Sequence, residues 1–388
     1  MHDAPIQPAE RSALLGFSDI VKIRNRVLEM RARGMRVIQL EGGEPFMPTP
    51  TFIKDAMKQA LDADHTRYAP SSGIPELVRA IHDKLSVKNG INVSPDHLIV
   101  TAGGLHALFC AFQATVNPGD EVLFFSPYWT PIRDLVTYSG GQPVTVSLDE
   151  LRGDGDLRAA IERGLTPRTR LIYVNTPANP TGDVFTRRQL EAIADVAKAK
   201  NLIVISDEAY EDLVYDGEHL SIASLPDMVE RTVSCYTLSK SFSMTGWRVG
   251  YLAAPLALME MLRKLVLNSV NGVSTPTQWA AVAAMRHDPH FFAPVRAEYR
   301  KRRDLLVTAL QKAGIDCPAP AGAFYVFPNI RGRFGNDSWS AMEQILDRAS
   351  IASVPGVVFG PEGEGHLRMS YSTSLELLEE AAASLAKL

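Results

Sequence analysis

The 388-residue sequence contains little cysteine and no long apolar run. Its three cysteines, Cys110, Cys235 and Cys317, are widely spaced and form no CxxC pair, which predicts buried thiols in a reducing compartment rather than disulfides or a zinc site. No stretch approaches the roughly 20 consecutive apolar residues of a membrane-spanning helix. The first residues, MHDAPIQPAER, lack the basic flank and apolar core of a signal peptide. We therefore expect a cytoplasmic protein.

The sequence also lacks an excess of basic charge. Lysine and arginine number 40 against 44 acidic residues, for a net charge of -4, so electrostatics gives no reason to expect nucleic acid or an anionic membrane as a partner. An apolar fraction of 46% and a charged fraction of 22% are typical of globular proteins. The length exceeds what one ordinary hydrophobic core needs and suits two domains.

Several well-known catalytic and binding motifs are missing. The sequence contains no GxxxxGK, HExxH or GxSxG segment, no EF-hand loop, and no GxGxxG after a predicted strand. These absences argue against a P-loop nucleotide site, a zincin, a serine hydrolase, a calcium site and a simple dinucleotide site. We expect no metal.

Short β-branched or aromatic runs alternate with segments of helical periodicity, as in a mainly parallel sheet covered by helices. Predicted strands are 97–101, 122–126, 143–147, 170–175, 202–206, 232–237 and 249–254, with helices that include 104–115, 187–200 and 256–271. These segments predict a large α/β domain over residues 47–286.

Both chain ends have a different pattern. Residues 18–33 form an amphipathic helix with Ser18 as its N-cap and Gly34 as its stop. A basic helix over 295–313 precedes a short strand at 324–327, a helix at 338–350, a strand around 368–371 and a terminal helix. We expect the two ends, residues 1–46 and 287–388, to form a smaller α+β domain together.

The segment YTLSKSFSMTGWRVGY, residues 236–251, contains the most informative lysine. A strand ends near Thr237 and Ser239, Lys240 follows, and Arg248 lies eight residues further on. Ligands bind outside the carboxyl ends of strands in α/β sheets, and two hydroxyls with an arginine fork suit a phosphate. The alternative is a lysine in a solvated loop.

Two loops after strands supply further candidates. In TAGGLH, the glycines at 103 and 104 would let backbone N–H groups approach an oxyanion at a helix N-terminus. In NTPANPTG, residues 175–182, prolines and asparagines make a rigid loop that could fix the side chain of Asn179. Each loop could also be only a tight connection.

Asp207 and Arg368 are charged residues in apolar surroundings. Asp207 follows the apolar run LIVI, and a buried acid is costly unless a cation meets it; the alternative is a helix N-cap at Ser206 or Asp207. Arg368 lies in HLRMSYS, where a lone arginine is most often a surface ion-pair partner.

Taken in order, these segments resemble the fold-type I pyridoxal 5'-phosphate (PLP) aminotransferases, most closely the aspartate-aminotransferase-like class I/II group. The likeness extends from Gly43-Glu44-Pro45 to the Arg368 strand. It implies a mostly parallel seven-stranded sheet between helices, with PLP held as a Schiff base on Lys240. The segments depart from the family at Phe46, where an acid is common near the substrate side, and at Thr237, where serine is more usual.

The resemblance also implies roles by matching position. Asp207 corresponds to the partner of the pyridinium nitrogen, and Lys240 to the residue that moves the substrate α-proton. Arg368 and the backbone of Gly43 correspond to the grip on the α-carboxylate. Tyr68 resembles the tyrosine that reaches the phosphate of a neighbouring subunit, which implies a homodimer. The remaining cofactor and substrate contacts implied are Gly104, Leu105, Trp129, Asn179, Tyr210, Thr237, Ser239 and Arg248.

The resemblance predicts ping-pong transfer of an amino group from an L-amino acid, aspartate or aromatic by default, to a 2-oxo acid such as 2-oxoglutarate. No second cation for a distal carboxylate can be located. A C–S β-lyase or related elimination enzyme on the same fold is the nearest alternative. A regulator with this fold is disfavoured, since the expected helix at 18–33 leaves no room for an N-terminal DNA-binding module.

Overall fold

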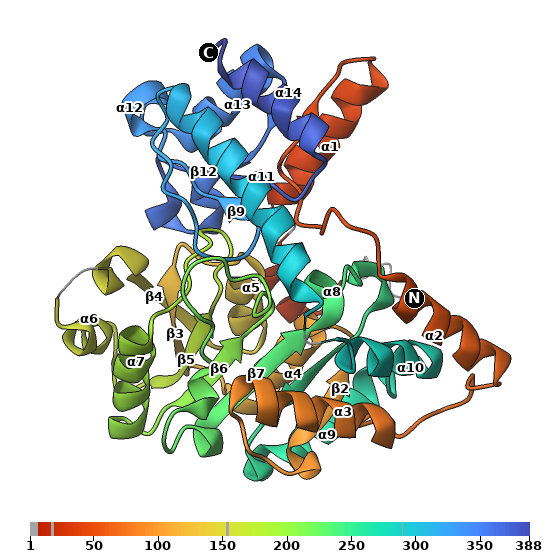
Figure 1. Cartoon of the computed structure of the whole chain (residues 1–388). Helices are drawn as coiled ribbons and strands as arrows, with labels where there is room; N and C mark the ends of the chain where they lie inside the picture. Colours follow the sequence, from red (N-terminus) through yellow and green to blue (C-terminus); the bar gives the residue numbers. More distant parts are fainter. Residues whose placement is uncertain (1–6, 17–18, 153–154, 289) are drawn as a thin grey trace, which may run out of the picture.

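The computed structural model describes residues 7–16, 19–152, 155–288 and 290–388 (Figure 1). The N-cap expected at Ser18 lies outside these residues, and α1 spans Asp19–Ala32. All three cysteines are buried free thiols, as predicted. None of the helices in the described ranges is long and apolar enough to cross a membrane.

The large sheet has seven strands in the order β2-β8-β7-β6-β5-β3-β4. Only β8 runs antiparallel to its neighbours, which confirms the mostly parallel sheet. The bounds are β2 Leu98–Thr101, β3 Glu121–Ser126, β4 Gln142–Ser147, β5 Thr169–Asn175, β6 Ile203–Asp207, β7 Thr232–Thr237 and β8 Gly250–Ala253. Each matches a predicted strand to within one residue at either end.

Helices cover both faces of this sheet because its strands are apolar on both sides. Along β5, Leu171 and Tyr173 face one layer, whereas Ile172 and Val174 face the other. The first layer contains α4 (Gly104–Thr115), α5 (Pro131–Tyr138) and α9 (Leu256–Val270). The second contains α6 (Leu157–Arg163) and α7 (Arg187–Ala199). A further cluster joins β2, β7 and β8 to α2 (Thr51–Asp62), α3 (Pro75–Lys84) and α10 (Thr275–Met285).

The two chain ends meet above the large sheet, in red and blue in Figure 1. Strand β1 (Ile38–Gln39) pairs in parallel with β10 (Ile351–Ala352). Strands β11 (Val354–Pro355), β12 (Leu367–Ser370) and β9 (Tyr325–Val326) form an antiparallel sheet in that order. The helices here are α1, α11 (Phe292–Lys312), α12 (Arg331–Phe334), α13 (Ser338–Ala349) and α14 (Leu375–Leu385). Domain boundaries at 46/47 and 286/287 stay a prediction.

Two of the boundaries that differ from the sequence-based expectation bear on the packing and on the site. Helix α11 begins at Phe292 rather than at 295, since Phe292 is buried and packs against Phe242 with ring centroids 5.2 Å apart. Strand β6 extends one residue beyond the expected strand and ends at Asp207, which agrees with an acid at the end of a buried strand.

Candidate active site

A cavity of about 610 Å³ opens where the carboxyl ends of the sheet strands face the segments from the two chain ends. It contains every residue predicted for the site except Tyr68. A larger hollow of about 960 Å³ beside α11 contains none of them, so we place the site in the smaller one. Its wall is formed by Ile20, Arg24, Gln39, Glu41, Gly42, Gly43, Glu44, Gly104, Leu105, Leu108, Trp129, Asn175, Asn179, Asp207, Ala209, Tyr210, Thr237, Ser239, Lys240, Thr245, Arg248, Tyr325 and Arg368.

The parallel sheet brings the polar residues together. Strands β5, β6 and β7 are parallel neighbours, so their last residues, Asn175, Asp207 and Thr237, lie along one edge. Directly after β7, the single-turn helix α8 (Leu238–Ser241) carries Lys240. This is the edge at which open α/β sheets bind ligands.

Asp207 is a buried acid with two protein donors. Its Oδ2 accepts a hydrogen bond from the Tyr173 hydroxyl at 2.8 Å, and its Oδ1 accepts one from the Ala209 backbone N–H at 3.2 Å. Burial raises the pKa of the Asp207 carboxyl to about 6, against the lowering effect of these donors. A turn follows β6 rather than a helix, so the N-cap alternative is wrong.

Lys240 faces the cavity instead of solvent. Its Nζ donates a hydrogen bond to the Gly43 carbonyl at 2.7 Å. Burial, together with the positive charge of Arg368, lowers the pKa of the Lys240 amine to about 8, while Glu44 and Asp207 oppose this shift. The amine is therefore closer to proton exchange at neutral pH than an ordinary lysine, and the interpretation as a solvated loop lysine is wrong.

Polar donors gather at the end of the cavity formed by α4 and α8. Thr237 Oγ1 accepts a hydrogen bond from the Ser239 N–H at 3.1 Å and donates one to Ser239 Oγ at 2.9 Å. Arg248, at φ 53°, donates from Nη2 to the Ala102 carbonyl at 3.3 Å. A Cβ at Gly103 would lie 2.5 Å from this Nη2, so only glycine lets the guanidinium approach. The first N–H groups of α4 have no acceptor within the helix, which suits an anion.

Arg368 occupies the opposite end and is only 3% exposed, so the surface ion-pair alternative is wrong. Its Nη1 donates to Asn179 Oδ1 at 3.2 Å and its Nη2 to the Glu41 carbonyl at 2.7 Å. Among the residues that the structure describes, none accepts a hydrogen bond from the buried Nε. The guanidinium lies over the Tyr325 ring, 4.5 Å from its centroid. A buried guanidinium with a spare donor suits a carboxylate.

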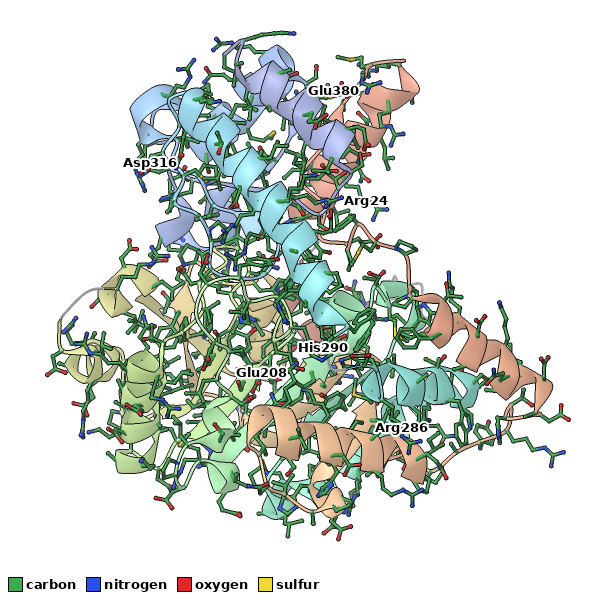
Figure 2. All side chains as sticks on the ribbon, viewed as in Figure 1. Arg24, Glu208, Arg286, His290, Asp316 and Glu380 are labelled. Atoms are coloured by element: carbon green, nitrogen blue, oxygen red, sulfur yellow. The ribbon has the colours of Figure 1, made fainter. Side chains whose placement is uncertain are left out.

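The sequence did not single out some residues of the cavity wall. The Tyr325 hydroxyl lies 3.0 Å from that of Tyr210, and a Cβ at Gly43 would lie 2.9 Å from it. Asn175 holds the NPTG loop, because its Oδ1 accepts the Asn179 N–H at 2.9 Å. Arg24 on α1 (Figure 2) adds an exposed cation to the cavity wall. Tyr325 sits in an apolar run that predicts only a core strand.

Phe46 and Tyr68 do not line the cavity. Phe46 was expected near the substrate side, but it does not contribute to the cavity wall. Its ring instead packs under the Arg302 guanidinium, with 3.7 Å between centroid and Cζ, and against Tyr299. Tyr68 lies outside the cavity with 93% of its surface exposed.

Comparison with known proteins decides the family. The family model described as aminotransferase class I and II matches residues 36–385. The chain belongs to this family. It is similar to a probable aspartate/prephenate aminotransferase of Thermus aquaticus, with 39% identity, 95% of this chain and 96% of the relative covered. It is also similar to an aspartate aminotransferase of Pyrococcus abyssi, with 40% identity and 92% of each chain covered.

Solved structures agree with this assignment. A double mutant of Thermus thermophilus aspartate aminotransferase superimposes with a TM-score of 0.93 at 38% identity, covering 98% of this chain and 99% of that one. An aromatic aminotransferase from Pyrococcus horikoshii OT3 gives 0.86 at 39% identity, covering 92% and 97%. The chain is thus a PLP-dependent aminotransferase of fold type I.

The residues of this aminotransferase fit the cofactor chemically. A buried carboxylate suits a protonated ring nitrogen, since each charge would compensate the desolvation of the other. A lysine with a lowered pKa suits an aldehyde. An arginine, two hydroxyls and a helix N-terminus suit a phosphate group. All three sets line the same cavity.

Proposed function

We propose that this aminotransferase moves the amino group of an L-amino acid, aspartate or an aromatic one, to a 2-oxo acid such as 2-oxoglutarate by a ping-pong route. The observation that carries the proposal is the convergence of the Lys240 amine, the Asp207 carboxylate and the Arg368 guanidinium on one cavity. The substrate classes are those in the names of the aspartate and aromatic aminotransferases that this chain resembles.

One set of residues would hold the cofactor. Asp207 would pair with the ring nitrogen, and Asn179 and Tyr210 would donate to the phenolic oxygen. Trp129 would stack on the ring. The bound cofactor supplies an electron sink for bond cleavage at the substrate Cα. The groups assigned to its phosphate are Thr237, Ser239, Arg248 and the backbone N–H groups of Gly104 and Leu105.

Two residues act on the substrate itself. Arg368 would bind the α-carboxylate with its planar fork, assisted by the backbone of Gly43, which fixes the direction of the Cα bonds. Lys240 Nζ, covalently bound to the cofactor between turnovers and free once substrate arrives, would take the Cα proton and return it. A pKa of about 8 leaves part of the free amine neutral near pH 7, as this role requires.

The proposed assembly is a cytoplasmic homodimer in which Tyr68 reaches the phosphate of the other subunit. An aromatic side chain that is 93% exposed supports this arrangement, because contact with a second copy would bury it. The Arg67 carbonyl nearby accepts a hydrogen bond from Thr275 Oγ1 at 2.6 Å, which fixes the backbone beside Tyr68.

The test combines mapping with an activity screen. Borohydride reduction of the holoenzyme followed by peptide mapping should place the cofactor on residue 240. Amino donors screened against 2-oxoglutarate, pyruvate and oxaloacetate should yield the new amino acid in equal amount to the keto acid formed. Pyruvate and ammonia released without any acceptor would identify a lyase instead and contradict the transaminase function.

A further inference from the structure

Asp212 is a buried acid near the site, and no step of the proposed function uses it. Only 5% of its surface is exposed. It follows Asp207 and Tyr210 in the same segment, in a turn where the Leu213 N–H donates to the Tyr210 carbonyl at 2.8 Å. Asp212 is therefore fixed to the stretch of chain that carries two of the residues assigned to the cofactor ring.

The segments that carry Asp207 and Lys240 leave the sheet side by side. The register of β6 with β7 ends at Asp207 and Cys235, and the Glu208 N–H still donates to the Cys235 carbonyl at 3.0 Å. Beyond that point, among the residues that the structure describes, one hydrogen bond joins segment 208–213 to segment 238–244. In it the hydroxyl of Ser241, the neighbour of Lys240, donates to Asp212 Oδ2 at 2.6 Å.

Helix α8, which carries Lys240, is too short to hold its own position. It has four residues, whereas isolated helices shorter than about 12 residues are marginal in water. At its first turn Thr237 Oγ1 accepts the Ser239 N–H at 3.1 Å. At its end the hydroxyl of Ser241, itself only 5% exposed, is bonded to Asp212. Lys240 lies between these two attachments.

The acceptor of this hydrogen bond is fixed from a third part of the chain. Asp212 Oδ1 forms an ion pair with Nζ of Lys88, which lies beyond the end of α3. The pair compensates the charge of the buried carboxylate. Hydrogen bonds to an ionised acceptor are roughly twice as strong as neutral ones, so the bond from Ser241 is a firm attachment for α8.

We propose that Asp212 and Ser241 are positioning residues for Lys240. Their hydrogen bond ties α8 to the turn that carries Asp207 and Tyr210, so the Lys240 amine keeps the direction that the proposed proton transfer needs. Misplacement of a reacting group by about 1 Å can cost about 100-fold in rate. Neither Asp212 nor Ser241 lines the cavity, so both act through Lys240. This inference rests on the proposed aminotransferase reaction and adds two residues to it.

Ser241→Ala in the holoenzyme is the decisive variant, because it removes one hydroxyl and leaves the ion pair of Asp212 with Lys88. We expect kcat to fall about tenfold and KM to change less than about twofold, since the substrate contacts assigned to Arg368 remain. With an α-deuterated donor, the isotope effect on kcat should equal or exceed that of the parent, because the slowed step is the proton transfer. A kcat within about twofold of the parent, or a smaller isotope effect, contradicts the inference.

Ser234→Ala is the matched control. Ser234 lies on β7 and is 1% exposed, and its hydroxyl has no hydrogen-bond partner in the part of the chain that the structure describes. This variant should keep the kcat and KM of the parent. Thermal melting of both serine variants checks that the fold is kept.

A double-mutant cycle tests whether Asp212 acts through Ser241. Asp212→Ala alone should lower kcat at least as much as Ser241→Ala. In the Ser241→Ala background it should lower kcat less than about twofold further, because the shared hydrogen bond is already lost. Losses in kcat that simply multiply would show that Asp212 does not act through Ser241. If Asp212→Ala does not fold, Ser241→Ala still decides the inference.

Hydrogen-exchange mass spectrometry of the full chain, with and without PLP, separates this inference from the proposed function. The Phe242 N–H donates to the Leu238 carbonyl at 3.2 Å, and the Met244 N–H to the Ser239 carbonyl at 3.1 Å. These amides should exchange at least about threefold faster in Ser241→Ala than in Ser234→Ala. Faster exchange in a protein that releases ammonia without an acceptor would support the role of Ser241 and contradict the transaminase function. Unchanged exchange with transamination intact would refute the role of Ser241 alone.

Discussion

The two ends of the cavity are built differently. At the cofactor end, Asp207, Thr237 and Lys240 come from the ends of adjacent parallel strands and from the turn that follows one of them. At the substrate end, Glu41 and Arg368 are 327 residues apart in the chain and meet through a hydrogen bond. The first end is fixed by one sheet, and the second by pairing between the two chain ends. The residues proposed to hold the cofactor and the arginine proposed to bind the substrate therefore depend on separate parts of the fold.

Lys240→Ala should give the largest effect and is confined to the cofactor end. Without the amine there is no covalent attachment and no base for the Cα proton, so we expect turnover to fall by about 10⁴-fold, the upper range for acid–base groups. Intact mass under native and denaturing conditions reports the lost covalent link. Lys264→Ala on the exposed face of α9 is the control. A variant that transfers amino groups at the parent rate would disprove the assignment.

The pH dependence of the stability of the cofactor-free protein tests the lowered pKa of Lys240. The pKa of Lys240 is about 8 in the folded protein, against 10.5 for an ordinary lysine. Between these two pH values the unfolded chain binds more protons than the folded protein. The folded state therefore gains stability as the pH rises from 8 to 10.5. Below pH 8, Lys240→Met should be more stable than the parent in urea unfolding. Its free energy of unfolding should be higher by up to about 3 kcal/mol, at roughly 1.36 kcal/mol per pKa unit. A difference that stays constant from pH 7 to 10.5 would contradict the lowered pKa.

Arg368→Lys tests the other end. A point charge replaces a planar fork, so the bonds to Asn179 and to the Glu41 carbonyl cannot both persist. We expect KM for amino and keto acids to rise about 10- to 100-fold, or roughly 1.4–2.8 kcal/mol, with kcat affected less. Arg26→Lys, in an exposed ion pair on α1, should behave like the parent. Unchanged affinity would count against the carboxylate role.

The same contrast explains what the sequence could predict. Lys240, Asp207 and Asn179 lie in short segments after predicted strands, and parallel pairing alone brings those strand ends to one edge. Tyr325 lies in an apolar run that is indistinguishable from a core strand, and its place in the cavity depends on β9 pairing with β12. Glu41 depends in the same way on β1 pairing with β10. Such long-range registers leave no local pattern in the sequence.

Phe46 shows the converse error. Its position beside Gly43 suggested a role near the substrate, since an acid is common there in the family. The structure turns its ring away, onto Arg302 and Tyr299. The chain bends at Glu44, Phe46 and Met47, so nearness in sequence to a site residue does not place a side chain in the site.

Tyr325→Phe should give the smallest effect. It changes a residue that contacts both Tyr210 and Arg368. The hydroxyl bonded to Tyr210 at 3.0 Å is lost, while the ring beneath Arg368 stays. One neutral hydrogen bond is worth about 1 kcal/mol, so kcat should fall roughly fivefold with KM nearly unchanged. Tyr325→Leu also removes the ring and its cation–π contact of about 0.5–2 kcal/mol, so KM should rise as well. If both variants change kcat and KM alike, the hydroxyl and the ring do not serve separate ends of the cavity.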